Sequence, residues 1–186
     1  MLKLIFAALI ISWNNFQVEL QSIKTGGCPF VPSVENFNLY QFTGQWYDIA
    51  HIPIPTLNLG KCVVMNCVID YSSIVRMSVN YYDGKQIQEI NNAFTINNAS
   101  GVYFVHVPMI NLKFEFIVVD TDYDNYSVIY ACAKLATLKI QLIWVLSRES
   151  TLSKDIYKNI TTSLKRHKLP YKKLKTVNQS KCPVYF

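Results

Sequence analysis

Cysteines are the residues of this sequence whose chemistry is most specific, and they stand at positions 28, 62, 67, 132 and 182. In an oxidising compartment this odd number predicts two disulfides and one free thiol, although spacing alone does not assign the pairs. A thiol becomes a nucleophile when a nearby cation or hydrogen-bond donor lowers its pKa. Without such a neighbour, a buried thiol behaves as a small apolar side chain.

The histidines do not form a recognisable metal or hydrolytic motif. His51, His106 and His167 are scattered, and the sequence contains neither His-Glu-x-x-His nor Gly-x-Ser-x-Gly. Cys62 and Cys67 lack the second pair of ligands that a structural zinc site requires. We therefore predict no metal site, no catalytic residue and no enzymatic activity.

The elements that must position these residues are mainly short strands. The chain has 186 residues, 51% of them hydrophobic and 16% charged, which suits one domain with a real core and excludes disordered or collagen-like chains. Eight apolar, β-branched and aromatic runs are separated by turn residues, as is typical of an antiparallel barrel or sandwich. These runs cover residues 44–53, 62–71, 74–82, 86–96, 101–107, 111–120, 126–134 and 140–147.

Alternation predicts the inward face of some of these strands. Apolar residues alternate with polar ones in the third run, so that one face carries Val75, Met77, Val79 and Tyr81. Phe114 and Phe116 likewise share one face, opposite two charged residues. Residues 102–107 are apolar on both faces, and there the inward set stays undetermined.

An amphipathic helix is predicted over residues 152–167. Ile156, Ile160 and Leu164 recur every fourth residue, and Pro170 lies beyond the helix end. The apolar stripe must pack on the outer face of the strands. We expect the tail from residue 171 to 186 to be extended.

The N-terminus resembles a signal peptide. Lys3 precedes a continuous apolar run over residues 4–11, which is too short to span a membrane. We predict a signal peptide over residues 1–20, cleaved between about residues 15 and 22, and one extracellular domain over residues 21–186. The alternative for the first segment is a buried strand. Four sequons, at Asn98, Asn125, Asn159 and Asn178, are candidate glycosylation sites.

Positive charge is concentrated near the C-terminus. Residues 154–186 carry half of the 18 lysine and arginine residues but a single acidic one, Asp155. We interpret this segment as the solvated face of the helix, and contact with an anionic membrane or glycosaminoglycan is the alternative. No nucleic-acid motif accompanies the charge, so we predict no nucleic-acid partner.

Three separated motifs resemble those of the lipocalins. Gly44-Gln45-Trp46 opens the first strand, Thr121-Asp122-Tyr123 forms a later turn, and Trp144 to Arg148 ends the last strand. They bracket the eight strands in the family's order and are followed by one helix. The resemblance implies an all-β fold: an eight-stranded antiparallel up-and-down β-barrel over about residues 44–147, with one C-terminal α-helix packed on it. It further implies that Gly44 lets the chain pass close at the closed end of the barrel, which we call the floor, and that Trp46 fills this end. Arg148 would lie across the Trp46 ring.

Cysteine context narrows the resemblance to the lipocalin group that contains apolipoprotein D and the insect bilin-binding proteins (insecticyanin-like). Cys28-Pro29, Gly60-Lys61-Cys62, Tyr130-Ala131-Cys132 and Lys181-Cys182-Pro183 carry this similarity. The group's pairing implies disulfides Cys28–Cys132 and Cys62–Cys182, which leaves Cys67 as a free thiol. The family also includes a prostaglandin D synthase that uses a barrel thiol, so catalysis by Cys67 is an alternative.

The resemblance also predicts a ligand-binding interior. Strand alternation from inward Trp46 and Trp144 and from outward Cys132 turns His51 outward and Asp48 inward. The predicted lining is Ala50, Ile52, Met65, Met77, Val79, Tyr81, Phe114, Phe116, Val118, Ile129, Ala131, Leu142 and Trp144. Such an apolar, aromatic wall suits a flat or elongated hydrophobic molecule.

The resemblance therefore implies a carrier without a resident cofactor. Its small hydrophobic ligand would be a lipid, fatty acid, steroid, retinoid or tetrapyrrole pigment. We expect the ligand to enter at an open end formed by residues 53–61, 83–86, 108–111 and 135–139. A further alternative is a surface-interaction or antioxidant protein that acts through the basic C-terminal segment, or, as an antioxidant, through methionine or cysteine.

Overall fold

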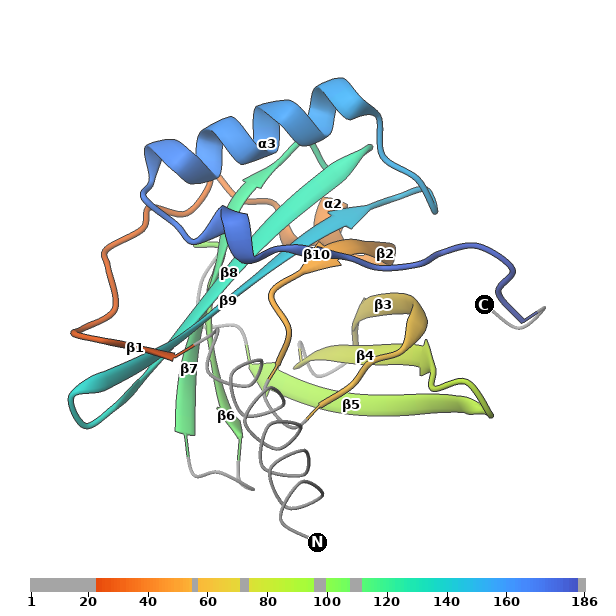
Figure 1. Ribbon diagram of the computed structural model, residues 1–186, viewed down its shortest axis with the longest axis horizontal. Coiled ribbons are helices and arrows are strands. Elements are labelled where there is room, and N and C mark those ends of the chain that lie inside the picture. The colour runs from red at the N-terminus through yellow and green to blue at the C-terminus, as the bar shows by residue number, and fades with distance from the viewer. Residues whose placement is uncertain (1–22, 55–56, 71–73, 96–99, 108–111, 184–186) are drawn as a thin grey trace, which may run out of the picture.

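The computed structural model describes residues 23–54, 57–70, 74–95, 100–107 and 112–183. Eight long antiparallel strands form one curled sheet in the order β5-β4-β3-β2-β9-β8-β7-β6 (Figure 1). Their bounds are β2 Gly44–His51, β3 Lys61–Ile69, β4 Ile74–Tyr82, β5 Ile87–Thr95, β6 Val102–Val107, β7 Leu112–Thr121, β8 Tyr126–Leu135 and β9 Leu138–Ser147. The eight predicted strands and their antiparallel meander are thus confirmed. Within the described ranges no ladder joins β5 to β6, so these strands form the two edges of a half-barrel.

One long helix of the described residues covers the outer face of the sheet (Figure 1). α3 spans Lys154–Arg166, close to the predicted range, and begins at Ser153, whose side chain accepts a hydrogen bond from the Ile156 N–H. Ile160 and Leu164 are buried in the core cluster that also contains Ile143 and Val145 of β9. The apolar stripe therefore packs as the spacing predicts. In the described part of the chain no helix is long and apolar enough to cross a membrane.

Short elements flank the barrel at both ends of the chain. The single-turn helix α2 (Leu39–Phe42) leads into β2, and β1 (Ile23–Thr25) pairs with β9. The C-terminal tail, expected to be extended throughout, first forms the 3₁₀ turn η3 (Tyr171–Lys173) and then β10 (Lys175–Thr176), which pairs with β2. The predicted signal peptide lies outside the described residues.

The C-terminal tail fills the place where β2 and β3 separate. The two strands pair from Gly44 opposite Cys67 to Tyr47 opposite Val64. Beyond that point the Cys62 N–H donates to the Asn178 carbonyl at 2.9 Å, and the Val177 N–H donates to the Ile49 carbonyl at 2.9 Å. Disulfides Cys62–Cys182 and Cys28–Cys132, the two pairs that the resemblance implies, attach the two flanking segments to the barrel.

A β-bulge in β2 reverses the faces of its last residues. Against β9, Asp48 lies opposite Leu146, but Ala50 lies opposite Val145 and His51 opposite Trp144. One extra residue in a strand moves every later side chain to the other face. Because Trp144 lies on the inner face, so does His51.

Two lining predictions and one outward prediction are therefore wrong. Ala50 and Ile52 were expected to line the barrel, but both lie on the outer face, in the core cluster that contains Ile160 and Leu164 of α3. His51 was expected to face outward. The cause is the bulge after Asp48, which breaks the simple alternation on which these three predictions depend.

Candidate functional site

Trp46 and Arg148 close one end of the barrel. Trp46 is fully buried, and its indole N–H donates to the Phe42 carbonyl at 2.8 Å. The Arg148 guanidinium lies 3.6 Å from the centre of the Trp46 ring, the cation–π contact expected of this pair. Gly44 passes beneath it with φ +94°, and a Cβ there would lie 3.3 Å from Arg148 Nη1.

Arg148 also uses three nitrogens to bind main-chain carbonyls. Nε donates to the Tyr123 oxygen at 2.9 Å, Nη1 to that of Gln45 at 2.8 Å and Nη2 to that of Gln41 at 2.8 Å. These acceptors belong to the β7–β8 turn, to β2 and to α2. A single side chain thus joins three segments at the closed end.

The turn between β7 and β8 is held by its own side chains. Thr121 Oγ1 donates to the Tyr126 carbonyl at 2.7 Å, and Asp122 Oδ1 accepts from the N–H groups of Asn125 and Tyr126 at 2.8 and 2.9 Å. The Tyr123 hydroxyl accepts from the Asn38 N–H at 2.9 Å. Thr121, Asp122 and Tyr123 therefore close the barrel floor.

The inner wall is mainly apolar and partly accessible. Strand register places on the inner face all the predicted lining residues except Ala50 and Ile52. Those buried in the core are Met65, Phe114, Val118, Ile129, Ala131 and Leu142. Those that remain partly exposed are Met77, Val79, Tyr81, Phe116 and Trp144. The Phe116 and Trp144 rings stack at 5.6 Å between centroids, which gives the wall a flat aromatic surface.

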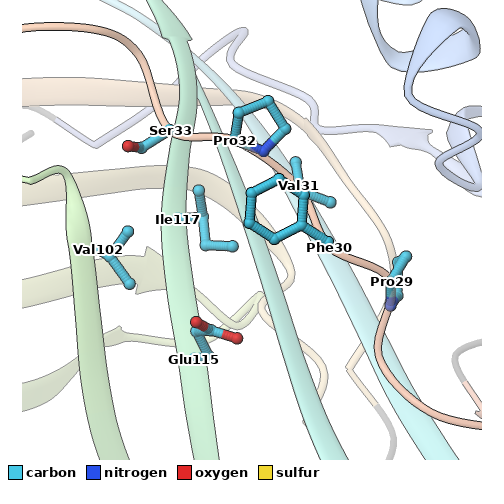
Figure 2. Close-up of a pocket in the computed structure, with 8 residues that line it drawn as sticks. All are labelled: Pro29, Phe30, Val31, Pro32, Ser33, Val102, Glu115 and Ile117. Carbon is cyan, nitrogen blue, oxygen red and sulfur yellow. The ribbon is translucent and has the colours of Figure 1, made fainter.

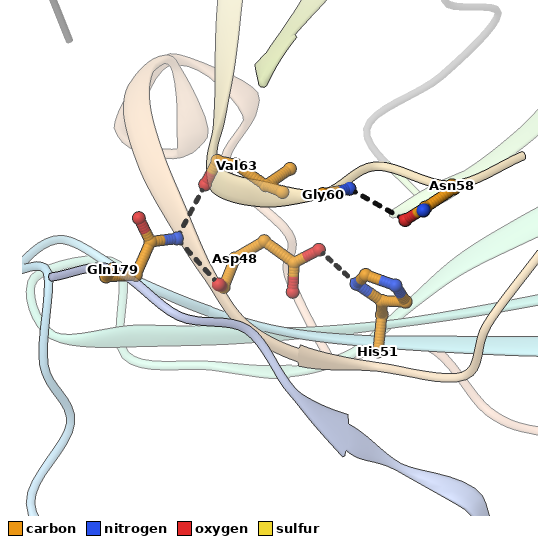
Figure 3. Close-up of polar contacts among 6 residues, drawn as sticks. All are labelled: Asp48, His51, Asn58, Gly60, Val63 and Gln179. Carbon is orange, nitrogen blue, oxygen red and sulfur yellow. Dashed lines mark hydrogen bonds and ion pairs between the residues drawn. The ribbon is translucent and has the colours of Figure 1, made fainter. Parts of the chain in front are cut away.

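Asp48 and His51 form a polar pair in this apolar wall. The bulge brings both side chains to the inner face, where His51 Nδ1 lies 2.7 Å from Asp48 Oδ2 (Figure 3). Burial raises the pKa of Asp48, and the hydrogen bond and charge of His51 oppose that rise. Asp48 Oδ1 is buried without a hydrogen-bond partner in the described part of the chain.

Gln179 of the C-terminal tail fixes the main chain around this pair. Its Nε2 donates to the carbonyls of Asp48 and Val63, both at 2.8 Å (Figure 3). One amide therefore links β2 to β3 where the two strands have separated. The backbone that carries Asp48 is held independently of its carboxylate.

Cys67 is free and buried on the inner face, opposite Met77. Burial raises the pKa of its thiol to about 11, and the charge of Arg148 opposes this only in part. At neutral pH the residue is therefore a thiol rather than a thiolate, which argues against a nucleophilic role. In the described ranges no three His, Cys, Asp or Glu residues gather as a metal site.

A hollow of about 310 Å³ lies on the outer face. The segment from Pro29 to Ser33 runs across β7 and lines it together with Val102, Glu115 and Ile117 (Figure 2). Val102 and Ile117 lie opposite each other on the outer face, whereas the next pair along the two strands, Tyr103 and Phe116, faces inward. This hollow is therefore separate from the barrel interior.

Three of the four sequon asparagines lie in described segments, and all three are exposed. Asn125 lies in the β7–β8 turn, Asn159 on α3 and Asn178 in the tail. Asn98 lies outside the described residues, as do residues 108–111 of the predicted open end.

His51 is the residue of the candidate site that the sequence analysis missed. The available signal was Asp48, a carboxylate on the inward face of an apolar strand. A histidine three residues later faces the opposite side of a regular strand. Their pairing requires a bulge, which the sequence pattern did not reveal.

Comparisons with known proteins agree with this geometry. The family model "Lipocalin / cytosolic fatty-acid binding protein family" matches residues 43–181. Apolipoprotein D of Macaca fascicularis is 29% identical over 182 residues, covering 90% of each chain. Lazarillo protein of Schistocerca americana is 25% identical over 183 residues, covering 94% of this chain and 83% of its own.

Solved structures show the same fold. Insecticyanin from the tobacco hornworm Manduca sexta is similar with a TM-score of 0.66 and 20% identity, covering 86% of this chain and 89% of its own. Apocrustacyanin C1 is similar with a TM-score of 0.73 and 20% identity, covering 87% of this chain and 94% of its own.

Proposed function

The chain belongs to the lipocalin / cytosolic fatty-acid binding protein family, and on this premise we propose that it is a secreted, non-enzymatic carrier. It holds one small hydrophobic molecule inside its barrel, reversibly and without a chemical step. The observation that carries the proposal is the apolar inner wall with its partly exposed Phe116–Trp144 stack. Burying apolar ligand surface there contributes roughly 25 cal/mol per Å².

The closed end and the disulfides support this function. Trp46 and Arg148 seal the floor, so that a ligand enters from the opposite end. Disulfides persist in oxidising compartments, and the two in this chain join residues 104 and 120 positions apart. The ligand classes we propose are lipids, fatty acids, steroids, retinoids and tetrapyrroles.

The primary test is native mass spectrometry, with organic extraction, of the protein secreted from eukaryotic cells. We expect a co-purifying hydrophobic molecule and an intact mass that shows one free thiol. An empty barrel that also fails to bind a panel of fatty acids, steroids, retinoids and biliverdin would contradict the carrier function.

Two valine variants locate the binding site. Val79 lies on the inner face and Val68 on the outer face of neighbouring strands, with Val68 51% exposed. We expect Val79→Trp to add bulk to the inner face and abolish binding. Val68→Trp adds the same side chain outside, so binding should persist. Equal loss in both variants would place the ligand elsewhere.

A second candidate function is binding of a sulfated glycosaminoglycan on the outer face. Lys24 of β1 lies opposite Lys139 of β9, which lies opposite Lys134 of β8. Like charges directly opposite each other destabilise a sheet unless an anion compensates them. Burial and the charge of Lys24 lower the pKa of Lys173 in η3, which shows that a fourth cation lies near this row.

Heparin chromatography tests this second function. We expect the double variant Lys134→Glu with Lys139→Glu to elute at lower salt than the wild type. The charge-neutral control is the double variant Lys85→Glu with Glu89→Lys. Both residues are exposed on the β4–β5 hairpin, away from the lysine row. Unchanged retention of the double variant would leave the lysine row without a polyanion partner.

A further inference from the structure

Asp48 and His51 set the polar requirement that the barrel imposes on a ligand. Both lie on the inner face of a mainly apolar wall, and Asp48 is only 2% exposed. Buried polar groups usually have all their partners, and each exception needs an explanation. Here Asp48 Oδ1 has no partner in the described residues, and the contact with Asp48 is the one hydrogen bond seen for the His51 ring.

The position of the shared proton decides what His51 offers to the interior. If Asp48 is ionised and His51 is protonated, the pair has no net charge and Nε2 carries a hydrogen. If the proton resides on Asp48 Oδ2, the carboxyl O–H donates a hydrogen bond to Nδ1, and the single hydrogen of the neutral ring must then lie on Nε2. Both of these uncharged arrangements present Nε2 as a donor.

Two arrangements leave Nε2 without a hydrogen. One is uncharged, with the acid hydrogen on Asp48 Oδ1 and the ring hydrogen on Nδ1, and it leaves Oδ1–H as a buried donor without an acceptor in the described residues. The other combines ionised Asp48 with a neutral ring that carries its hydrogen on Nδ1, and it places a net negative charge in the wall. Burial opposes such an uncompensated charge, in the same direction as it shifts the carboxyl of Asp48. Burial of the pair opposes both of these arrangements, so we assign Nε2 as the donor, and no acceptor for it lies in the described residues.

The donor lies beside the accessible part of the wall. The His51 side chain is 14% exposed, and its partner across the ladder is Trp144, which stacks on Phe116. A flat ligand lying against these rings would reach the imidazole edge with one substituent. A carboxylate in that position would add a buried negative charge to a pair that carries no net charge.

We propose that His51 Nε2 donates a hydrogen bond to a neutral oxygen of the ligand, a carbonyl or hydroxyl oxygen, and that the buried Asp48–His51 pair, which has no net charge, selects against carboxylates. This inference rests on the proposed carrier function and defines its ligand class. His51 is the binding residue, and Asp48 is the positioning residue that holds the imidazole and its proton.

Three pyrenes with one ring system test the inference at pH 7.5 on the full, disulfide-bonded protein. Pyrene has no acceptor, 1-acetylpyrene has a neutral carbonyl, and pyrene-1-carboxylate is an anion. Energy transfer from tryptophan to pyrene reports binding. We expect the wild type to bind 1-acetylpyrene at least about tenfold more tightly than pyrene-1-carboxylate.

Variants separate the hydrogen bond from simple packing. We expect His51→Phe to weaken the binding of 1-acetylpyrene about tenfold and to change the affinity for pyrene by less than about twofold, because only the ketone loses a hydrogen-bond partner. His51→Gln retains a donor and should recover part of the ketone affinity. His167→Phe makes the same replacement at the end of α3, outside the barrel, and should change neither ligand.

The outcomes distinguish this inference from the carrier function. Equal weakening of pyrene and 1-acetylpyrene by His51→Phe would show a packing role and overturn the inference, while the carrier function would stand. Tighter binding of the carboxylate than of the ketone would also overturn it. If the wild type binds none of the three pyrenes, the carrier proposal fails for flat ligands, and the inference fails with it.

Discussion

Two sites on β2, at Trp46 and Asp48, differ in whether their buried polar groups have hydrogen-bond partners. At the closed end, the indole of Trp46 has an acceptor, and Arg148 donates to three carbonyls while its guanidinium covers the ring. In the middle of the strand, Asp48 has one oxygen bound to His51 and the other unbound in the described structure. The polar groups of the first site thus have hydrogen-bond partners, whereas one oxygen of the second site has none in the described residues.

This difference separates stability from binding. Saturated buried networks stabilise a fold, whereas an unsatisfied buried group costs about 1–3 kcal/mol. Departures from local consistency are expected mainly at functional sites. The floor therefore maintains the barrel, and the Asp48–His51 pair keeps hydrogen-bonding capacity for a ligand.

Replacing Trp46 by alanine should produce the largest effect. Trp46 is fully buried and packs on Phe42 at 5.3 Å between ring centroids. We expect the free energy of unfolding to fall by about 3–5 kcal/mol, since truncation leaves a large cavity. Urea unfolding measures this loss. A cost below about 1 kcal/mol would show that the floor does not determine stability.

Arg148→Met should cost about 2 kcal/mol by the same measurement. The variant removes the cation–π contact and leaves three carbonyl oxygens without their donor. Arg148→Lys keeps the charge but not the planar fork, so it should recover only part of the loss. Full recovery by lysine would mean that charge alone accounts for the contribution of Arg148.

Asp48→Asn should have a smaller effect, whose sign depends on pH. Burial raises the pKa of Asp48 above 3.8, so the folded protein retains this proton to a higher pH than the unfolded chain. The wild type therefore loses stability as pH rises through the interval between these two pKa values. Asparagine does not titrate, so its stability relative to the wild type should improve from pH 3.5 to pH 7. Urea unfolding at both values checks this, and a constant difference would contradict the raised pKa.

Cys67 should show no detectable alkylation in the folded state near neutral pH. With a pKa of about 11, roughly one thiol in a thousand is ionised at pH 8. Iodoacetamide should label it only above about pH 10 or after unfolding in urea. Rapid selective labelling of the native protein at pH 7 would restore the enzymatic alternative.

Most of the fold was predictable because it depends on local patterns. Alternation and turn residues determined the eight strands, and the four-residue spacing of Ile156, Ile160 and Leu164 determined α3. The Trp46–Arg148 contact was expected from the motifs that carry both residues. These features depend on residue types close in sequence or on a family pattern.

The remaining features depend on register, which single strands do not encode. The shift between Asp48 and Ala50 is defined against β9, nearly 100 residues later in the chain, and it moved three predicted side chains to the opposite face. β1 and β10 contain three and two residues, too few for a periodic signal. His51 was therefore missed because its inward position depends on how β2 pairs with β9, which the β2 sequence alone does not show.

The C-terminal tail determines when the barrel wall is completed. Residues 175–182 bridge the gap between β2 and β3 through β10, Gln179 and the Cys62–Cys182 disulfide. They are synthesised after all eight long strands, so a nascent chain can form its hairpins and bury much of its core while this gap stays open. The gap between β2 and β3 is bridged only when residues 175–182 dock and Cys182 is oxidised. This part of the wall therefore depends on hydrogen bonds between residues that lie 116 and 131 positions apart in the sequence.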